Sequence, residues 1–144
     1  MSIDVLAEVR VARPREEVAA YMTDPANDPE WIGGLREARL VGGAPVAEGR
    51  RVARVASFMR RRVEYVNEIV RLEPGSVLEM RSVKAPFPMH ITYTFEDADG
   101  ATVVRNHVRG GGGIFSLGSP LFAPMVKRNV QRDLERMRDV LERR

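Results

Sequence analysis

The sequence predicts a single α+β domain in which a curved seven-stranded antiparallel sheet wraps around one long C-terminal helix. Three observations predict this architecture. Seven segments alternate apolar and polar residues with the two-residue period of half-buried strands. Two short helical segments follow the first strand, and the C-terminal part of the chain repeats apolar residues at the spacing of an amphipathic helix.

Length and composition limit the classes of protein to which the chain can belong. A chain of 144 residues with 44% hydrophobic and 30% charged residues is typical of one globular domain, which we assign to residues 1–144. No apolar run approaches the roughly 18 residues of a spanning helix, and the start resembles no signal peptide, so we expect a cytoplasmic protein without membrane insertion. The absence of cysteine excludes disulfides, thiolate zinc sites and thiol nucleophiles.

The net charge of +3 does not by itself predict a nucleic-acid partner. Nearly all positive charge is arginine, and acidic residues are interspersed along the chain, which is typical of a mixed solvated surface. The one dense cluster is Arg60-Arg61-Arg62. A phosphate or membrane contact is one interpretation of this cluster, but we favour a solvated hairpin turn.

The first strand and the two short helices are predicted by local patterns. Alternation from Ile3 to Val11 predicts a strand with one buried face. Pro14 suits the first turn of a helix that extends to about Met22, because the N–H that proline lacks would have no partner there. Asp28-Pro29-Glu30-Trp31 predicts a second helical turn.

The middle of the chain predicts a meander of antiparallel strands. Glycine, proline and aspartate break it at regular intervals, which favours tight turns between neighbouring strands. The six predicted strands are 35–41, 51–58, 63–72, 77–83, 89–96 and 102–108. After residues 110–113, a glycine run that we interpret as a hinge, an amphipathic helix is predicted from near Ser119 to Arg144, with Leu134 in the middle of its apolar stripe.

Several short motifs give the chain a resemblance to a known family. The segment from Val11 to Trp31 contains Pro-x-Glu-x-Val, then Asp-Pro, then Pro-x-Trp. Further matching segments are 70–74, the hairpin 100–104, 121–126 and 132–137. With these motifs the chain resembles the START-like polyketide cyclase/dehydrase family over essentially its full length, and the resemblance implies a helix-grip fold.

The resemblance implies a cavity between the concave sheet and the C-terminal helix, but no particular reaction. We therefore expect binding of a small hydrophobic molecule such as a lipid, polyketide or aromatic metabolite. The alternative is a polyketide cyclase/dehydratase-type enzyme that uses cavity-facing polar residues for proton transfer. No cofactor is expected, no catalytic residue is assigned, and the chain is expected to be a monomer or a homodimer.

Strand alternation ranks the residues that would line this cavity. If Thr102 and Val104 face inward, as in the family hairpin, so does Asn106, whereas His107 faces solvent. The same argument predicts inward-facing residues on three other strands: Arg54 and Phe58 on 51–58, Glu68 on 63–72, and Tyr93 on 89–96. Because a buried ionised group needs a partner, we expect Arg54 and Glu68 to pair, either as a structural ion pair or as groups that orient a ligand together with Tyr93.

Other candidate lining residues are apolar. Trp31 is interpreted either as a lid or as an anchor of the second short helix. Phe122, Met80 and Met125 are expected in the ligand wall, with plain core packing as the alternative for the methionines. His90 and His107 are too few for a metal site, so no metal is expected.

Overall fold

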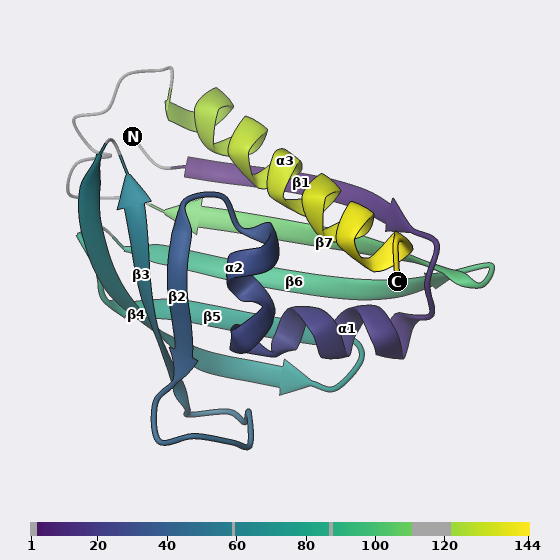
Figure 1. Cartoon of the computed structure of the whole chain (residues 1–144), viewed down its shortest axis with the longest axis horizontal. Coiled ribbons are helices and arrows are strands. Elements are labelled where there is room, and N and C mark those ends of the chain that lie inside the picture. The colour runs from purple at the N-terminus through teal and green to yellow at the C-terminus, as the bar shows by residue number, and fades with distance from the viewer. Residues whose placement is uncertain (1–2, 59, 87, 111–121) are drawn as a thin grey trace.

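The structure is a computed structural model that describes residues 3–58, 60–86, 88–110 and 122–144. The chain forms one sheet, two short α-helices with a 3-10 turn between them, and one long helix (Figure 1). The strands are β1 (Ile3–Val11), β2 (Leu35–Leu40), β3 (Arg51–Phe58), β4 (Arg61–Glu73), β5 (Val77–Lys84), β6 (Met89–Ala98) and β7 (Ala101–Gly110). The helices are α1 (Arg15–Thr23), η1 (Pro25–Asn27), α2 (Asp28–Trp31) and α3 (Phe122–Glu142).

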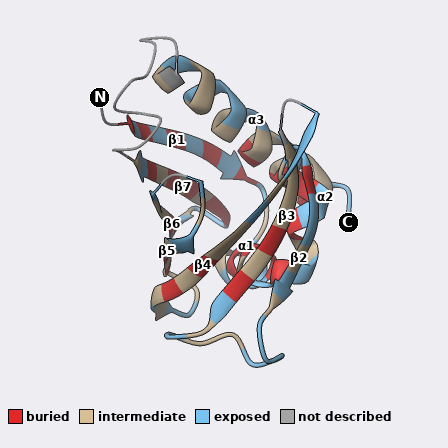
Figure 2. Cartoon of the chain, turned by 90° about the vertical axis from the view of Figure 1, so that its left-hand side faces the viewer, coloured by how far each residue is buried: buried red, intermediate tan, exposed pale blue. Residues whose placement is uncertain are grey.

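The sheet has seven antiparallel strands in the order β1-β7-β6-β5-β4-β3-β2. Strands β2 to β7 follow one another as a meander, and β1 pairs with β7, so β1 and β2 form the two edges. The sheet curls around α3, with α1 and α2 beside it on the same side (Figures 1 and 2). The predicted helix-grip architecture is therefore confirmed.

Boundaries of the strands and of α1 agree with the sequence predictions to within a few residues, and the arginine cluster is the informative exception. The predicted helix start near Ser119 and residues 111–113 of the predicted glycine hinge lie outside the described residues. Only Arg60 adopts a turn conformation, with φ of 64°, whereas Arg61 and Arg62 already pair with Phe58 and Ser57. The cluster is thus mostly strand, and its side chains are solvated on the outer part of the β3–β4 hairpin.

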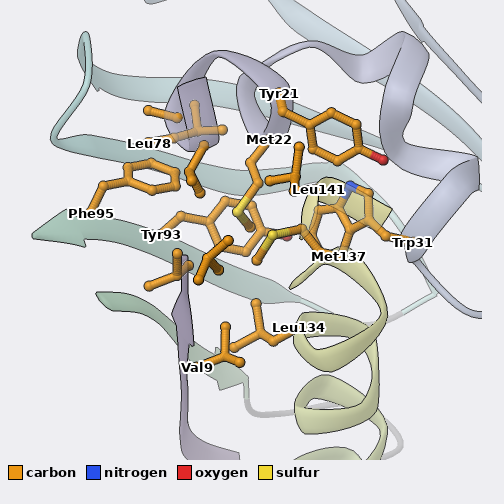
Figure 3. Packing of buried hydrophobic residues seen from close by; sticks show 14 of the residues in the cluster. Val9, Tyr21, Met22, Trp31, Leu78, Tyr93, Phe95, Leu134, Met137 and Leu141 are labelled. Atoms are coloured by element: carbon orange, nitrogen blue, oxygen red, sulfur yellow. The ribbon is translucent and has the colours of Figure 1, made fainter. Parts of the chain in front are cut away.

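Helix α3 packs its apolar stripe against the concave face of the sheet. Leu134, Met137 and Leu141 are fully buried, and they contact a core that includes Val9 and Tyr93 (Figure 3). Burial of such a stripe is the main source of stability for a long surface helix. None of the described helices is long and apolar enough to cross a bilayer.

The same helix also covers the free edge of β1. The Gln131 side chain accepts the Glu8 N–H at 3.3 Å and donates to the Glu8 carbonyl at 2.9 Å. Glu142 accepts the Ala12 N–H at 2.8 Å. These side chains occupy backbone groups that another strand would otherwise pair with.

The inward face of β4 differs from the sequence prediction. The sequence analysis predicts that Glu68 faces the core, but Asn67 and Ile69 are the buried residues of this strand. The β3–β4 register places Tyr65 opposite Arg54 and Glu68 opposite Arg51. Because the strand carries apolar residues at both odd and even positions, its alternation is ambiguous, and pairing with β3 decides which set is buried.

Candidate functional site

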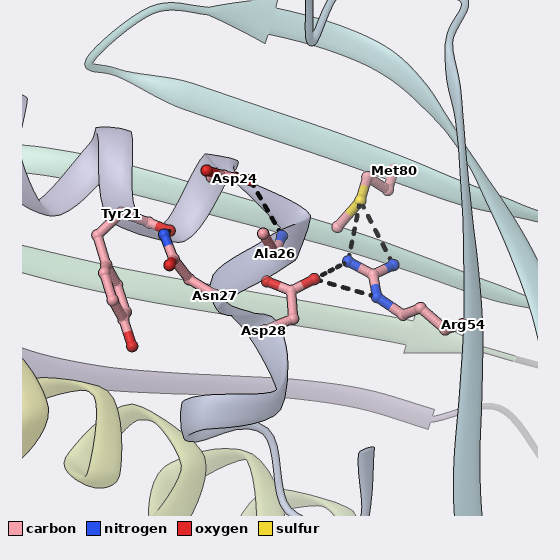
Figure 4. Close-up of polar contacts among 7 residues, drawn as sticks. All are labelled: Tyr21, Asp24, Ala26, Asn27, Asp28, Arg54 and Met80. Carbon is pink, nitrogen blue, oxygen red and sulfur yellow. Dashed lines mark hydrogen bonds and ion pairs between the residues drawn. The ribbon is translucent and has the colours of Figure 1, made fainter. Parts of the chain in front are cut away.

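Two charged side chains are buried inside the described structure, Asp28 and Arg54. Asp28 is the first residue of α2, and Arg54 lies on the concave face of β3. Arg54 Nη2 donates to Asp28 Oδ2 at 2.6 Å, and Arg54 Nε donates to the same oxygen at 3.3 Å (Figure 4). A buried guanidinium needs such a partner, so the pair ties the short helix to the sheet.

The expected pairing of Arg54 with Glu68 is wrong. Glu68 lies on the outer face, where its carboxylate oxygens are 3.8 Å from Arg51 Nε and 3.3 Å from Arg81 Nη2. Arg54 is on the concave face, and the sheet separates the two side chains. The error follows directly from the register of β4, since a shift of one residue exchanges the two faces of a strand.

The rest of the Arg54 guanidinium lies beside the Met80 side chain. Nη1 and Nη2 lie 3.9 and 4.0 Å from the Met80 sulfur, a weak acceptor (Figure 4). Tyr65 lies directly opposite Arg54 on β4. Arg54 therefore has one strong ionic partner and additional N–H groups that face an apolar wall.

Burial sets the protonation states in this interior. Burial raises the pKa of the Asp28 carboxyl, and the Arg54 guanidinium only partly offsets the rise. Burial opposes the charge on Arg54, but the Asp28 carboxylate, Tyr65 and Tyr93 together outweigh this effect and raise the pKa of the guanidinium. Burial also raises the pKa of the phenols of Tyr65 and Tyr93. At neutral pH these phenols are therefore neutral and can donate a hydrogen bond.

Trp31 and Tyr93 form the aromatic part of the site. Their ring centroids are 6.0 Å apart with an interplanar angle of 61°, an edge-to-face contact. Trp31 is only 1% exposed, and its carbonyl accepts a hydrogen bond from Arg136 Nη1 at 2.9 Å. Trp31 thus anchors α2 in the core. Its indole Nε1 is buried without a hydrogen-bond partner among the described residues.

Asn106 faces the same interior from β7. It lies directly opposite Tyr93 on β6 and Ala7 on β1. It is buried together with Thr102, whereas His107 is on the exposed side, so the predicted inward face of this strand is confirmed. The Asn106 Oδ1 atom also has no hydrogen-bond partner within the described part of the chain.

The structure says less about the positions of the other residues predicted to line the cavity. Met125 lies in the first turn of α3 and is partly buried. The side chains of Phe58 and Phe122 lie outside the described part of the structure. Within the described residues no group of three or more potential metal-ligating side chains comes together.

Sequence reasoning missed three polar residues of the site: Asp28, Tyr65 and Asn67. Tyr65 and Asn67 follow from the register of β4 against β3. A correct β3–β4 hairpin register would have revealed them. Nothing local in the sequence pairs Asp28 with a residue 26 positions away.

The polar residues Arg54, Tyr93 and Asn106 are covered by the packing of other described side chains. A hollow of about 640 Å³ lies at one end of the sheet, beside Ile3 and Gly110. Another of about 420 Å³ lies between α1 and the β4–β5 turn. Neither is lined by Arg54, Tyr93 or Asn106. Access to these three residues therefore requires movement of the side chains that cover them.

Comparison with solved structures shows the same fold at low sequence identity. TTHA0849 from Thermus thermophilus is 19% identical, with a TM-score of 0.80 and 94% of each chain covered. Ara h 8.0201 is 12% identical, with a TM-score of 0.78 and full coverage of both chains. The di-domain ARO/CYC StfQ from the steffimycin biosynthetic pathway is 12% identical, with a TM-score of 0.78, 96% of this chain covered and 50% of StfQ.

Comparison with protein families is more specific than comparison of folds. A search of curated proteins found no match. The sequence profile described as "Polyketide cyclase / dehydrase and lipid transport" matches residues 2–142, nearly the whole chain. The chain belongs to the polyketide cyclase/dehydrase and lipid transport family.

Proposed function

We propose that the chain binds a small, mainly hydrophobic molecule that carries a carbonyl or hydroxyl group, between the concave face of the sheet and α3. Family membership supports a ligand-binding or cyclase role. Sites for such molecules combine apolar walls with a few fixed polar groups. The interior of this chain has that composition, with Trp31, Tyr93 and Asn106 adjoining one another within the apolar core.

The observation that carries the proposal is a pair of buried, unsatisfied polar atoms next to Tyr93. Trp31 Nε1 is a donor and Asn106 Oδ1 is an acceptor, and neither has a partner among the described residues. A buried polar atom without a partner costs about 1–3 kcal/mol. A ligand oxygen can accept a hydrogen bond from such a donor, and a ligand hydroxyl can donate to such an acceptor, so a ligand that supplies either group recovers part of that cost.

Access to these atoms requires a change in packing, and the core contains adaptable side chains. Met22 and Met137 are buried beside Tyr93 and Trp31 (Figure 3), and Met80 belongs to the same buried cluster. Methionine has three rotatable bonds and a polarisable sulfur, so it adjusts to a ligand at smaller cost than a branched side chain. We propose that the ligand displaces these methionines and part of α3.

A second candidate function is favoured by the buried carboxyl beside Arg54. A carboxyl with a raised pKa next to a fixed positive charge is an arrangement that can remove a proton adjacent to a carbonyl and stabilise the resulting enolate. In this cyclase/dehydratase alternative Asp28 is the candidate base, because it is the carboxylate paired with Arg54, whereas Glu68 lies on the other face of the sheet. The neutral phenol of Tyr93 would donate a hydrogen bond to the substrate oxygen.

The binding proposal is tested with ligand pairs that share a carbon skeleton, such as naphthol and naphthalene. Asn106→Leu deletes the acceptor at similar side-chain volume, so it should weaken naphthol about fivefold, the equivalent of one net hydrogen bond of about 1 kcal/mol. Naphthalene should bind both proteins alike. Isothermal titration and the ligand-induced rise in melting temperature measure the two affinities.

His107→Leu is the matched control. It changes the adjacent residue of the same strand, but its side chain is on the outer face. It should leave both affinities unchanged. Equal losses from the two substitutions, or no binding of any member of a panel of fatty acids, flavonoid-like aromatics and short polyketide mimics, would contradict the proposal.

A further inference from the structure

The outer face of the sheet carries a cross-strand row of charged side chains far from the interior site. The β-register places Asp4, Arg109, His90 and Arg81 opposite one another on β1, β7, β6 and β5. The row continues on β4 with Glu68, which lies opposite Arg81. Three basic residues are thus adjacent in the middle of the row, with one acidic residue at each side.

The acidic residues around this row already have partners, and two of these partners, Arg81 and His90, belong to the row. Asp4 Oδ1 is 2.6 Å from His107 Nε2. Glu68 is shared between Arg51 and Arg81, and Glu79 hydrogen-bonds to His90.

Arg109 differs from Arg81 and Arg105, the arginines nearest to it on the outer face. It forms no ion pair with any described residue. Arg105, four residues earlier on the same strand, pairs with both Glu8 and Glu96. The positive charge of Arg109 is therefore not neutralised by an ion pair within the described part of the chain.

This part of the row lines a hollow of about 640 Å³. All four residues of the row from Asp4 to Arg81 contribute to it, and Ile3, Pro88 and Met89 form its apolar border. Neighbouring strands are about 4.8 Å apart, so the two arginine Cα atoms are separated by roughly 10 Å across His90. Two side chains of this length can converge on one oxyanion between them, and the planar guanidinium matches its geometry.

We propose that this hollow is a second binding site, for the oxyanion group of a small molecule or lipid headgroup, with Arg109 and Arg81 as its ligands and His90 between them. The chemical class is a phosphate or carboxylate attached to a partly apolar molecule, because the hollow combines cationic and apolar borders. The site is on the opposite face of the sheet from Arg54 and does not depend on the interior site.

The test measures binding of inorganic phosphate by titration at constant ionic strength. Arg109→Gln should weaken phosphate about tenfold, the loss expected when one charge-assisted hydrogen bond is removed. Arg105→Gln is the matched control, because it removes one positive charge from the same face of the same strand outside the hollow. It should change the affinity less than about twofold, since only the long-range field changes. Thermal unfolding of both variants confirms that they are folded.

Vesicles distinguish the two sources of the oxyanion. Sedimentation with phosphatidylcholine vesicles that contain phosphatidic acid, compared with pure phosphatidylcholine vesicles, measures headgroup binding. In either assay, binding at this site should be abolished by Arg109→Gln and preserved by Arg105→Gln. Such binding to vesicles assigns the site to a lipid headgroup. Such binding to free phosphate alone assigns it to a soluble ligand. Equal losses in the two variants, or no binding of either probe by the unmodified protein, would overturn the proposal.

Discussion

The two faces of the sheet use the same residue types in opposite ways. On the concave face one arginine, Arg54, is 6% exposed and depends on one carboxylate, Asp28. On the outer face Arg105 is 37% exposed and pairs with Glu8 and Glu96. The outer arginine has more ionic partners than the inner one. Stability nevertheless depends much more on the single partner of Arg54, because water can replace a lost partner only on the outer face.

Because the two faces differ in how much a charge depends on its partner, buried charged residues have structural roles, whereas exposed ones are available for binding. A charge inside the sheet must be compensated within the fold, so Asp28 and Arg54 form a matched pair. A charge outside can remain uncompensated at small cost and be available to a ligand, as we propose for Arg109. The polar atoms available to a ligand inside are instead uncharged, on Trp31 and Asn106.

Removal of the buried carboxylate should have the largest effect on stability. Asp28→Asn leaves the Arg54 guanidinium buried without a counter-charge, which should lower the free energy of unfolding by about 3–5 kcal/mol. Urea unfolding followed by the fluorescence of the sole tryptophan, Trp31, measures the change. The double variant Asp28→Leu with Arg54→Met should regain most of the loss, because an apolar pair replaces the ionic one.

The outer face supplies the control for this prediction. Glu8→Gln removes one of two carboxylates from the exposed Arg105 and should leave the urea midpoint unchanged within error. If Asp28→Asn were as mild as Glu8→Gln, the contrast between the two faces would be wrong.

Truncation of the α3 stripe should have the next largest effect. Leu134 is fully buried against the sheet, so Leu134→Ala should lower the free energy of unfolding by about 2–5 kcal/mol. Arg132→Ala, at an exposed position two residues earlier, should change it by less than about 0.5 kcal/mol. Chemical denaturation that gave similar small losses for both would show that α3 does not depend on its apolar stripe.

A partly buried carboxylate at the boundary between interior and solvent should have a smaller, pH-dependent effect. Burial raises the pKa of Asp133 to about 6, although the Gly33 N–H, which Asp133 Oδ1 accepts at 3.0 Å, and Arg136 both lower it. The folded state therefore binds a proton more tightly than the unfolded state. This contribution to stability is complete below about pH 4 and is lost as the pH rises through about 6.

Asp133→Asn should remove this pH dependence while its amide oxygen still accepts the Gly33 N–H. At pH 7 the variant should be more stable than the unmodified protein, by roughly 1 kcal/mol when the partial exposure of the carboxylate is taken into account. Melting temperatures measured from about pH 4 to pH 7, the window of the shifted titration, test this. A slope that is the same in both proteins would assign the effect to another group.

Much of the fold could be predicted because its signals are local. The β1 bounds, Ile3 to Val11, follow from an alternation that only Leu6 interrupts, and the α3 stripe through Leu134 follows from helical spacing. The inward face of β7 was also predictable, since the position of Thr102 and Val104 sets that of Asn106. Among the residues of the candidate site, these local signals predicted the inward positions of Asn106, Tyr93 and Arg54.

The sequence by itself determined the order of the elements, the antiparallel meander and the presence of one gripping helix, because each depends on periodicity over neighbouring residues. Tertiary structure alone decided that Arg54 pairs with Asp28, that Glu68 faces solvent, and that the basic residues of β5, β6 and β7 form one row. These features depend on strand register and on contacts between distant parts of the chain. A register shift of one residue leaves the local pattern of β4 almost equally apolar but reverses the face of every side chain.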